Sequence, residues 1–258
     1  MTHAHFQPVG GAAGDMILAS LVGAGAPLEE ISSTLGRLGV TFELHTERVE
    51  VNGVGALGVT VEHPSEHAHR TFRTIRGMIE GAGLPGRASQ RAVEAFRLLA
   101  VAEGKIHDED PEEVTFHEVG AVDSIVDMVG SCVALELLNV DSISCEPLPM
   151  GSGVVKAAHG PLPIPGPATL EILKGSRVRW PRESGEMTTP TAAALMVSFT
   201  GITFSYDAPG MVVGSVGYGA GTARFEETPN FLRVVVGEAD TPSASGAQDR
   251  PPRCLVAG

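Results

Sequence analysis

Residues 116–138 read FHEVGAVDSIVDMVGSCVALELL, and this stretch does most to decide the fold. From Val122 onward the residues are apolar on nearly every side of a helical projection, which predicts a long buried helix over 122–138. Asp123 and Asp127 are four residues apart, so they share one face of that helix. The stretch therefore predicts a core helix that carries two carboxylates.

Strands and helices are predicted on both sides of this helix. A strand over 5–9 leads through a glycine-rich turn at 10–14 into a helix over 15–24, and Asn52-Gly53 joins two alternating strands over 41–51 and 56–62. The other expected elements are helices over 27–38, 71–80, 87–106, 168–173 and 191–199, strands over 142–148, 211–216 and 231–236, and a Gly- and Pro-rich loop over 149–167. This mixture predicts the α/β class, a mixed sheet with helices packed around it.

The composition excludes several functional classes. A formal net charge of −13 on 258 residues argues against binding to nucleic acid, and no apolar run is long enough for a membrane helix. The N-terminus lacks the features of a signal peptide, and three cysteines without a CxxC pair predict no disulfide framework, so we expect a cytoplasmic protein. We expect one large or two closely packed domains over 1–237 and a disordered tail over 238–258.

The first candidate site is a metal site at the start of the long helix. His117 and Glu118 directly precede the helix that carries Asp123 and Asp127. Two carboxylates on a buried helix need a metal ion, another cation or strong donors as partners. Together with His117 they form the nitrogen and oxygen set that a divalent transition metal accepts. The alternative is structural, with Asp123 at a favourable helix start and Asp127 paired with an arginine.

A second source of metal ligands is the tract HPSEHAH over 63–69. His67 and His69 share one face if this segment is extended, and imidazole suits nickel, copper and zinc. A solvated loop that contains histidines is an equally good interpretation of this tract.

Two glycine-rich turns are candidates for binding phosphate. The turn in VGGAAGDM, over 9–16, connects a strand to a helix, where backbone N–H groups can hold an anion. A Gly-Ser-Gly turn over 151–153 is the second candidate, and neither turn matches a P-loop or GxGxxG. Tight turns packed against the core have the same composition, so both interpretations stay open. The predicted phosphate-binding residues are Gly10, Gly11, Gly14, Asp15, Gly151, Ser152 and Gly153.

The order of several motifs resembles that of the LarC family of nickel-insertion proteins. These motifs are GDM at 14–16, the histidine tract, FHEVGAVDSIVD at 116–127, PLPMGSG at 147–153, AHGPLPIPGPAT at 158–169, GEMTTPT at 185–191 and VGYGAGT at 216–222. The resemblance covers residues 5–237. One departure lies in QPVGGAAGDM at 7–16, where both serines of the family's pattern are replaced.

The resemblance implies a lyase, a nickel chelatase or cyclometallase, that inserts Ni²⁺ into pyridinium-3,5-bisthiocarboxylic acid mononucleotide. The product is the nickel pincer cofactor of lactate racemase-type enzymes. The family also uses CTP with Mg²⁺ or Mn²⁺, and the CTP-associated C-terminal domain is absent from this chain. We expect His117, Glu118 and His159 to be catalytic, and the expected nickel ligands are His67, His69, His117, Asp123 and Asp127.

An alternative follows from the missing domain. The chain would then be a non-catalytic half that binds nickel or the substrate and needs a separate CTP-binding partner chain. A homo-oligomer is also compatible with the sequence.

Overall fold

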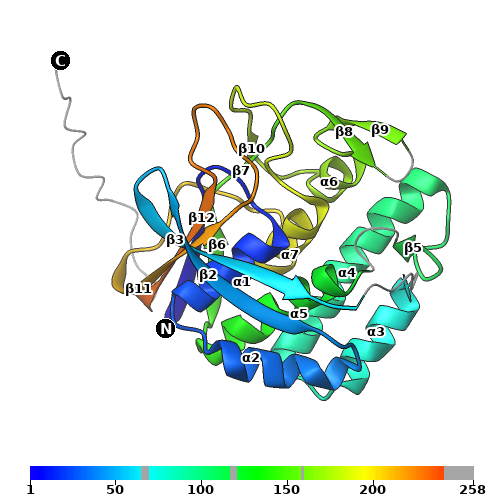
Figure 1. The fold of residues 1–258 in the computed structure, drawn as a ribbon, viewed down its shortest axis with the longest axis horizontal. Helices are drawn as coiled ribbons and strands as arrows, with labels where there is room; N and C mark the ends of the chain where they lie inside the picture. The colour runs from blue at the N-terminus through cyan, green and yellow to red at the C-terminus, as the bar shows by residue number, and fades with distance from the viewer. Residues whose placement is uncertain (65–69, 117–120, 158–159, 241–258) are drawn as a thin grey trace, which may run out of the picture.

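A six-stranded mixed sheet forms one side of the protein (Figure 1). The computed structural model describes residues 1–64, 70–116, 121–157 and 160–240. The strand order is β2-β3-β11-β12-β1-β6, with β1 antiparallel to β12 and parallel to β6. The strands are β1 (Thr2–Pro8), β2 (Glu43–Val51), β3 (Val54–Glu62), β6 (Ser142–Cys145), β11 (Met211–Ala220) and β12 (Phe231–Ala239). The predicted α/β class with a mixed sheet is confirmed.

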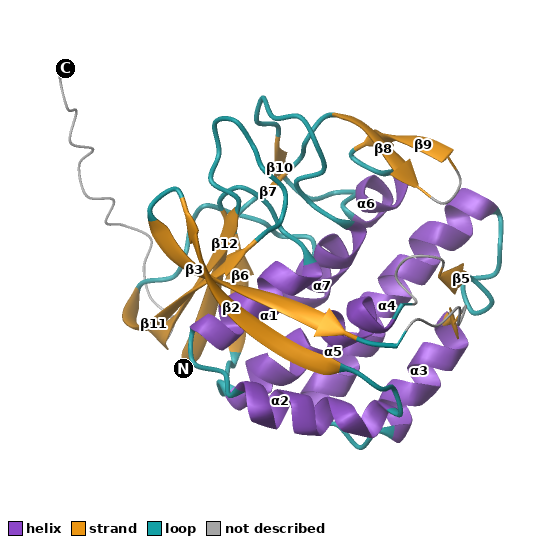
Figure 2. Ribbon diagram, in the orientation of Figure 1, coloured by secondary structure: helices purple, strands orange, loops and turns teal. Residues whose placement is uncertain are grey.

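The helices gather on one side of this sheet (Figure 2). They are α1 (Gly14–Gly23), α2 (Leu28–Leu35), α3 (Phe72–Gly81), α4 (Gly86–His107), α5 (Val122–Leu137), α6 (Pro167–Ile172) and α7 (Pro190–Thr200), with a short 3₁₀ turn at Gly36–Leu38. Thr189 caps α7 by accepting a hydrogen bond from the Ala192 N–H, and Pro190 occupies the first helical position, where no N–H is needed.

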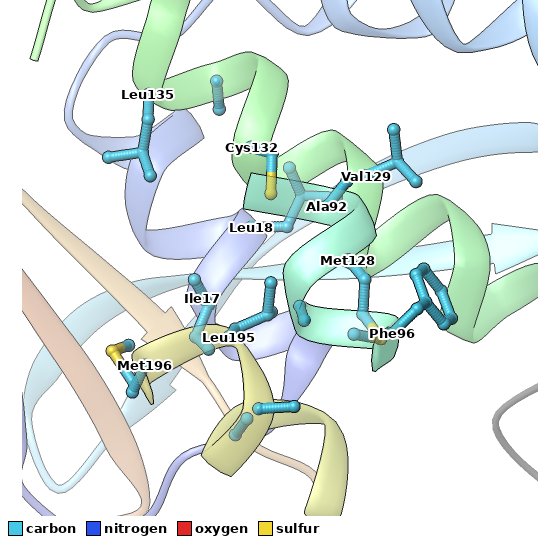
Figure 3. Close-up of a cluster of buried hydrophobic side chains, with 14 of the residues drawn as sticks. Ile17, Leu18, Ala92, Phe96, Met128, Val129, Cys132, Leu135, Leu195 and Met196 are labelled. Carbon is cyan, nitrogen blue, oxygen red and sulfur yellow. The ribbon is translucent and has the colours of Figure 1, made fainter. Parts of the chain in front are cut away.

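Helix α5 is the central helix of the core, as the sequence predicts. It packs against α1, α2, α4 and α7. Figure 3 shows Met128, Val129 and Cys132 of α5 among Leu18 of α1 and Phe96 of α4, all of them buried. Because α5 is enclosed by other helices, any polar group on it is either partnered or costly.

The hairpin β2–β3 forms as predicted. Asn52 and Gly53 have φ of 51° and 80°, the positive values that a tight two-residue hairpin turn requires. Beyond this turn the two strands pair along their whole length.

Two predictions about strands are wrong. The predicted loop over 149–167 contains a hairpin, β8 (Gly153–Ala157) with β9 (Gly160–Ile164). Pro161 and Pro163 suggested a loop, yet an isolated two-stranded hairpin has free edges, where a missing N–H is tolerated. The predicted strand over 142–148 is divided into β6 and β7 (Leu148–Pro149), and β7 pairs with β10 (Val178–Arg179). A third short pair joins β4 (Arg70–Thr71) and β5 (Thr115–Phe116).

The predicted tail begins slightly too early. Strand β12 runs to Ala239, so residues 238 and 239 belong to the sheet, and 241–258 lie outside the described residues. In the part of the chain that the structure describes, no helix is long and apolar enough to cross a membrane.

Candidate functional site

The glycine-rich turn between β1 and α1 is closed by other parts of the chain. A side chain at Gly10 would place its Cβ 2.1 Å from the Pro229 carbonyl oxygen, and one at Gly11 would place it 2.8 Å from the Met187 carbonyl oxygen. The Ala12 N–H donates to the same Met187 carbonyl at 2.8 Å. Glycine is therefore required here for close packing of the chain, and two amides of the turn, those of Gly10 and Ala12, already have protein partners.

The last glycine of the turn, Gly14, lies where α1 and α5 approach each other. A Cβ at Gly14 would lie 3.1 Å from the Cβ of Asp127 and 3.7 Å from Oγ1 of Thr191. Because Gly14 has no side chain, the carboxylate of Asp127 lies against the first turn of α1. Asp15, the next residue, belongs to that same turn.

Three aspartates interact electrostatically at this junction, and one of them has an oxygen that finds no partner among the described residues. Oδ1 of Asp15 accepts from the Met16 N–H at 2.8 Å, and Oδ1 of Asp123 accepts from the Ser124 N–H at 2.7 Å. Oδ1 of Asp127 is buried and accepts no hydrogen bond from any described residue. An oxygen left in this state costs about 1–3 kcal/mol, which a bound cation or donor would recover.

The negative charges of these aspartates repel one another. Burial raises the pKa of the Asp127 carboxyl well above its usual value of 3.8, and the nearby charges of Asp15 and Asp123 raise it further. Burial also raises the pKa of Asp15, against the effect of its hydrogen bond from the Met16 N–H. Carboxylates that disfavour each other's ionisation favour a cation between them. We call Asp15, Asp123 and Asp127 the aspartate cluster.

The segment 183–189 joins the two glycine-rich turns. The Thr189 N–H donates to the Ala12 carbonyl at 3.0 Å. At the other end of the segment, the Gly185 N–H donates to the Ser152 carbonyl at 2.8 Å. Two turns that are far apart in sequence are thus attached to one short stretch of backbone.

The Gly-Ser-Gly turn is docked on this segment. A Cβ at Gly151 would lie 1.7 Å from the Gly185 carbonyl oxygen, and Ser152 Oγ donates to the Glu183 carbonyl at 2.8 Å. This close packing explains why glycine stands at 151 and serine at 152. Phosphate binding by Gly151, Ser152 and Gly153 stays a prediction.

Comparison with known proteins now assigns the chain to a family. A family model described as "Nickel insertion protein" matches residues 4–250. The chain belongs to the nickel insertion protein family. One relative is a putative nickel insertion protein of Geotalea daltonii. It is 43% identical to this chain over 236 residues, which are 90% of this chain and 60% of the relative. The pyridinium-3,5-bisthiocarboxylic acid mononucleotide nickel insertion protein of Geobacillus kaustophilus is 42% identical over 248 residues, 92% of this chain and 60% of the relative.

The chain spans about three fifths of the length of the curated relatives that it matches. A protein of Staphylococcus epidermidis with the same name as the Geobacillus one is 40% identical over 232 residues, 89% of this chain but 58% of the relative. No solved structure matches the chain.

The structure of this nickel insertion family member describes only part of the predicted metal site. Asp123 and Asp127 lie in the first two turns of α5, as predicted, and Asp15 lies near enough to raise the pKa of Asp127. Phosphate binding by Gly10, Gly11, Gly14 and Asp15 stays a prediction. Five predicted residues lie outside the described ones, namely His67, His69, His117, Glu118 and His159. Within the described ranges, no group of three or more His, Cys, Asp or Glu side chains is arranged to hold a metal ion. The nickel ligands therefore stay a prediction.

Two cysteines of the described part of the chain are poor candidates for nickel ligands. Both Cys132 and Cys145 are buried. Burial raises the pKa of the Cys132 thiol to about 12 and also raises that of Cys145. Metal ions bind the thiolate form, which is scarce at neutral pH when the pKa is this high.

A second buried polar group was not predicted from the sequence. Strands β1 and β6 place His3 opposite Ser142 and His5 opposite Ser144. The two ring nitrogens of His3 lie 2.7 Å from the hydroxyl oxygens of Ser142 and Ser144, and Nδ1 of His5 lies 2.7 Å from the Ser144 hydroxyl. We call these four residues the histidine–serine ladder.

The ladder continues into charged residues. Nε2 of His5 lies 3.7 Å from Oε1 of Glu146, and the Gln7 amide donates to the same oxygen at 2.6 Å. The Arg233 guanidinium donates to Oε1 of Gln7 at 2.6 Å. Burial lowers the pKa of both His3 and His5 below 6.5, although Glu146 opposes this effect at His5.

The signal for the ladder was present in the sequence. HAH at 3–5 and SIS at 142–144 alternate with the period of a strand. The alternation predicts contact between these side chains only when β1 is known to pair with β6, because that pairing places the polar residues of both strands on one face.

Proposed function

We propose that this chain inserts Ni²⁺ into pyridinium-3,5-bisthiocarboxylic acid mononucleotide, as a nickel chelatase of the lyase class. The observation that carries the proposal is the aspartate cluster, in which Asp127 has a buried oxygen without a partner among the described residues, near two more carboxylates. The names of the relatives from Geobacillus and Staphylococcus support the choice of metal and substrate.

The residues divide into two roles in this proposal. The charges of the aspartate cluster attract the cation. Asp123 and Asp127 bind it together with the nitrogen ligands His67, His69 and His117. A bond from nickel to the pyridinium ring carbon releases a proton, and His117, Glu118 or His159 accepts it. CTP with Mg²⁺ or Mn²⁺ is the proposed co-substrate, and we assign none of the described residues to it.

The test is a reconstitution followed by mass spectrometry. The full chain is mixed with the dithiolated pyridinium mononucleotide, Ni²⁺, Mg²⁺ and CTP, and the nickel-containing product is measured. We expect product from the wild type and none from His117→Ala. His45→Ala, at an exposed histidine of β2, is the matched control and should leave product formation unchanged.

Two outcomes separate the alternatives. Product that forms only after addition of the part of a full-length relative outside the matched region would show that the chain is the nickel- or substrate-binding half of a two-part enzyme. That alternative is motivated by the three-fifths coverage of the relatives. No product under either condition would overturn the proposed function.

A further inference from the structure

Three threonines surround the start of α7, and they differ in what they contact. Thr188 Oγ1 donates to the Pro149 carbonyl at 2.7 Å and is buried. Thr189 Oγ1 accepts from the Ala192 N–H at 3.2 Å and is the helix cap. Thr191 Oγ1 lies instead beside Gly14, at the aspartate cluster.

The Thr191 hydroxyl has a proton available for a ligand. Its oxygen lies 2.8 Å from Thr189 Oγ1. Since Thr189 Oγ1 already accepts the capping hydrogen bond, it can donate its own proton to Thr191. Thr191 is then free to donate its proton to a group that lies next to Gly14.

Two helix N-termini meet at this point. Helix α1 begins at Gly14 and α7 at Pro190, and the two helices contact each other and α5. The first N–H groups of a helix have no acceptor within the helix and carry partial positive charge. Because Pro190 has no N–H, Thr191 offers the first backbone donor of α7 as well as its hydroxyl.

The same place also attracts a cation. Oδ2 of Asp127 would lie 3.5 Å from a Cβ at Gly14, the point that Thr191 Oγ1 also approaches. Oδ1 of the same carboxylate is buried and has no hydrogen-bond partner in the part of the chain that the structure describes. Helix N-termini attract anions, whereas the Asp127 carboxylate attracts cations. A phosphate with a divalent cation bound to it can interact favourably with both.

We propose that Thr191 and the N-termini of α1 and α7 bind the phosphate of the pyridinium mononucleotide, next to a divalent cation held by Asp127. This inference rests on the proposed function for the identity of the nucleotide. It places the phosphate at the junction of Gly14 and Thr191, at the end of the first glycine-rich turn.

The test compares two probes that differ only in the phosphate. Nicotinate mononucleotide and its phosphate-free nucleoside are titrated into the full chain by calorimetry in the presence of Ni²⁺. We expect the wild type to bind the mononucleotide more tightly than the nucleoside. Thr191→Val should weaken mononucleotide binding by about tenfold or more, the usual effect of losing a hydrogen bond to a charged group. It should change the affinity for the nucleoside or for Ni²⁺ alone by less than twofold.

Two further variants test whether the hydroxyl itself is responsible. Thr191→Ser keeps the hydroxyl and should restore most of the mononucleotide affinity. Thr200→Val is the matched control at the other end of α7, where Oγ1 donates to the Met196 carbonyl, and it should bind both probes like the wild type.

The inference is overturned if the wild type binds both probes equally or binds neither, or if Thr191→Val binds the mononucleotide like the wild type. Selective binding of the mononucleotide in a protein that never yields the nickel product would overturn the proposed function and leave this inference standing.

Discussion

The aspartate cluster and the histidine–serine ladder both contain buried polar atoms, yet the two differ in how those atoms are partnered. In the ladder, both ring nitrogens of His3 have hydroxyl partners at 2.7 Å. In the cluster, Asp127 has a buried oxygen to which no described residue donates, and two like charges lie near it. The ladder is built from neighbouring strands of one sheet, and the cluster from helix starts that are distant in sequence.

The difference suggests how to distinguish structural from functional polar groups in this molecule. A fully hydrogen-bonded network stabilises the fold and needs nothing else. A buried carboxylate oxygen without a partner costs stability, and a bound ligand can offset that cost. The following predictions test this contrast.

The largest effect is expected for Asp127→Asn, measured by nickel titration and by thermal unfolding. The affinity for Ni²⁺ should fall on the order of 100-fold, because a charged ligand is lost. Without nickel the variant should be more stable than the wild type. A carboxyl with a raised pKa destabilises the fold increasingly as the pH rises above 3.8, and asparagine does not ionise. A gain of about 1 kcal/mol corresponds to a rise in Tm of roughly 2–4 °C for a chain of this size.

The control for this experiment is Glu47→Gln, at an exposed carboxylate of β2. It should change neither the nickel affinity nor the Tm. A lower Tm for Asp127→Asn would mean that the cluster stabilises the fold, and the contrast with the ladder would be lost.

A smaller and opposite effect on stability is expected for Ser144→Ala. The change removes the hydroxyl shared by His3 and His5 and leaves a ring nitrogen of each without its partner. Urea denaturation should show a loss of about 1–3 kcal/mol. Nickel affinity should stay that of the wild type, and a loss of nickel binding would show that the ladder belongs to the site.

The smallest effect expected is a pH dependence of stability that arises in the ladder. Burial lowers the pKa of His3 and His5 below 6.5, so the unfolded chain takes up protons more readily than the folded one. Stability from these groups is complete above pH 6.5 and is lost as the pH falls below it. The charged groups that face His5 are Glu146 and Arg233, and Glu146 limits the loss.

This pH dependence is measured as the Tm of the nickel-free protein between pH 8 and pH 5. The double variant His3→Gln, His5→Gln should have a flatter profile over this range than Asp127→Asn. Equal slopes for these two variants would refute the assignment of the pH effect to the ladder.

Local patterns in the sequence predict most of the fold. The apolar run of α5, the Asn52-Gly53 turn and Pro190 at the start of α7 each act through neighbouring residues, so each was predicted correctly. The β8–β9 hairpin was missed because Pro161 and Pro163 argue against a strand, and their tolerance depends on which edges are free.

The site was predicted only in part, for a reason of the same kind. The spacing of Asp123 and Asp127 places both on one helix face, which is a local property. That Asp15 and Thr191 join them depends on how α1 and α7 pack on α5. The glycines at 10 and 11 also have a packing role, because they contact Met187 and Pro229, which lie far away in the sequence.

The segment 183–189 has a consequence for how the molecule opens. Its Met187 carbonyl accepts a hydrogen bond from the Ala12 N–H. Its Thr189 N–H donates to the Ala12 carbonyl, and its Gly185 N–H donates to the Ser152 carbonyl. None of these three amides can exchange its hydrogen with solvent while the segment stays in place. Their exchange rates should therefore be similar to one another, and a ligand bound between Gly14 and Thr191 should slow all three together, including that of Gly185 at the far end of the segment.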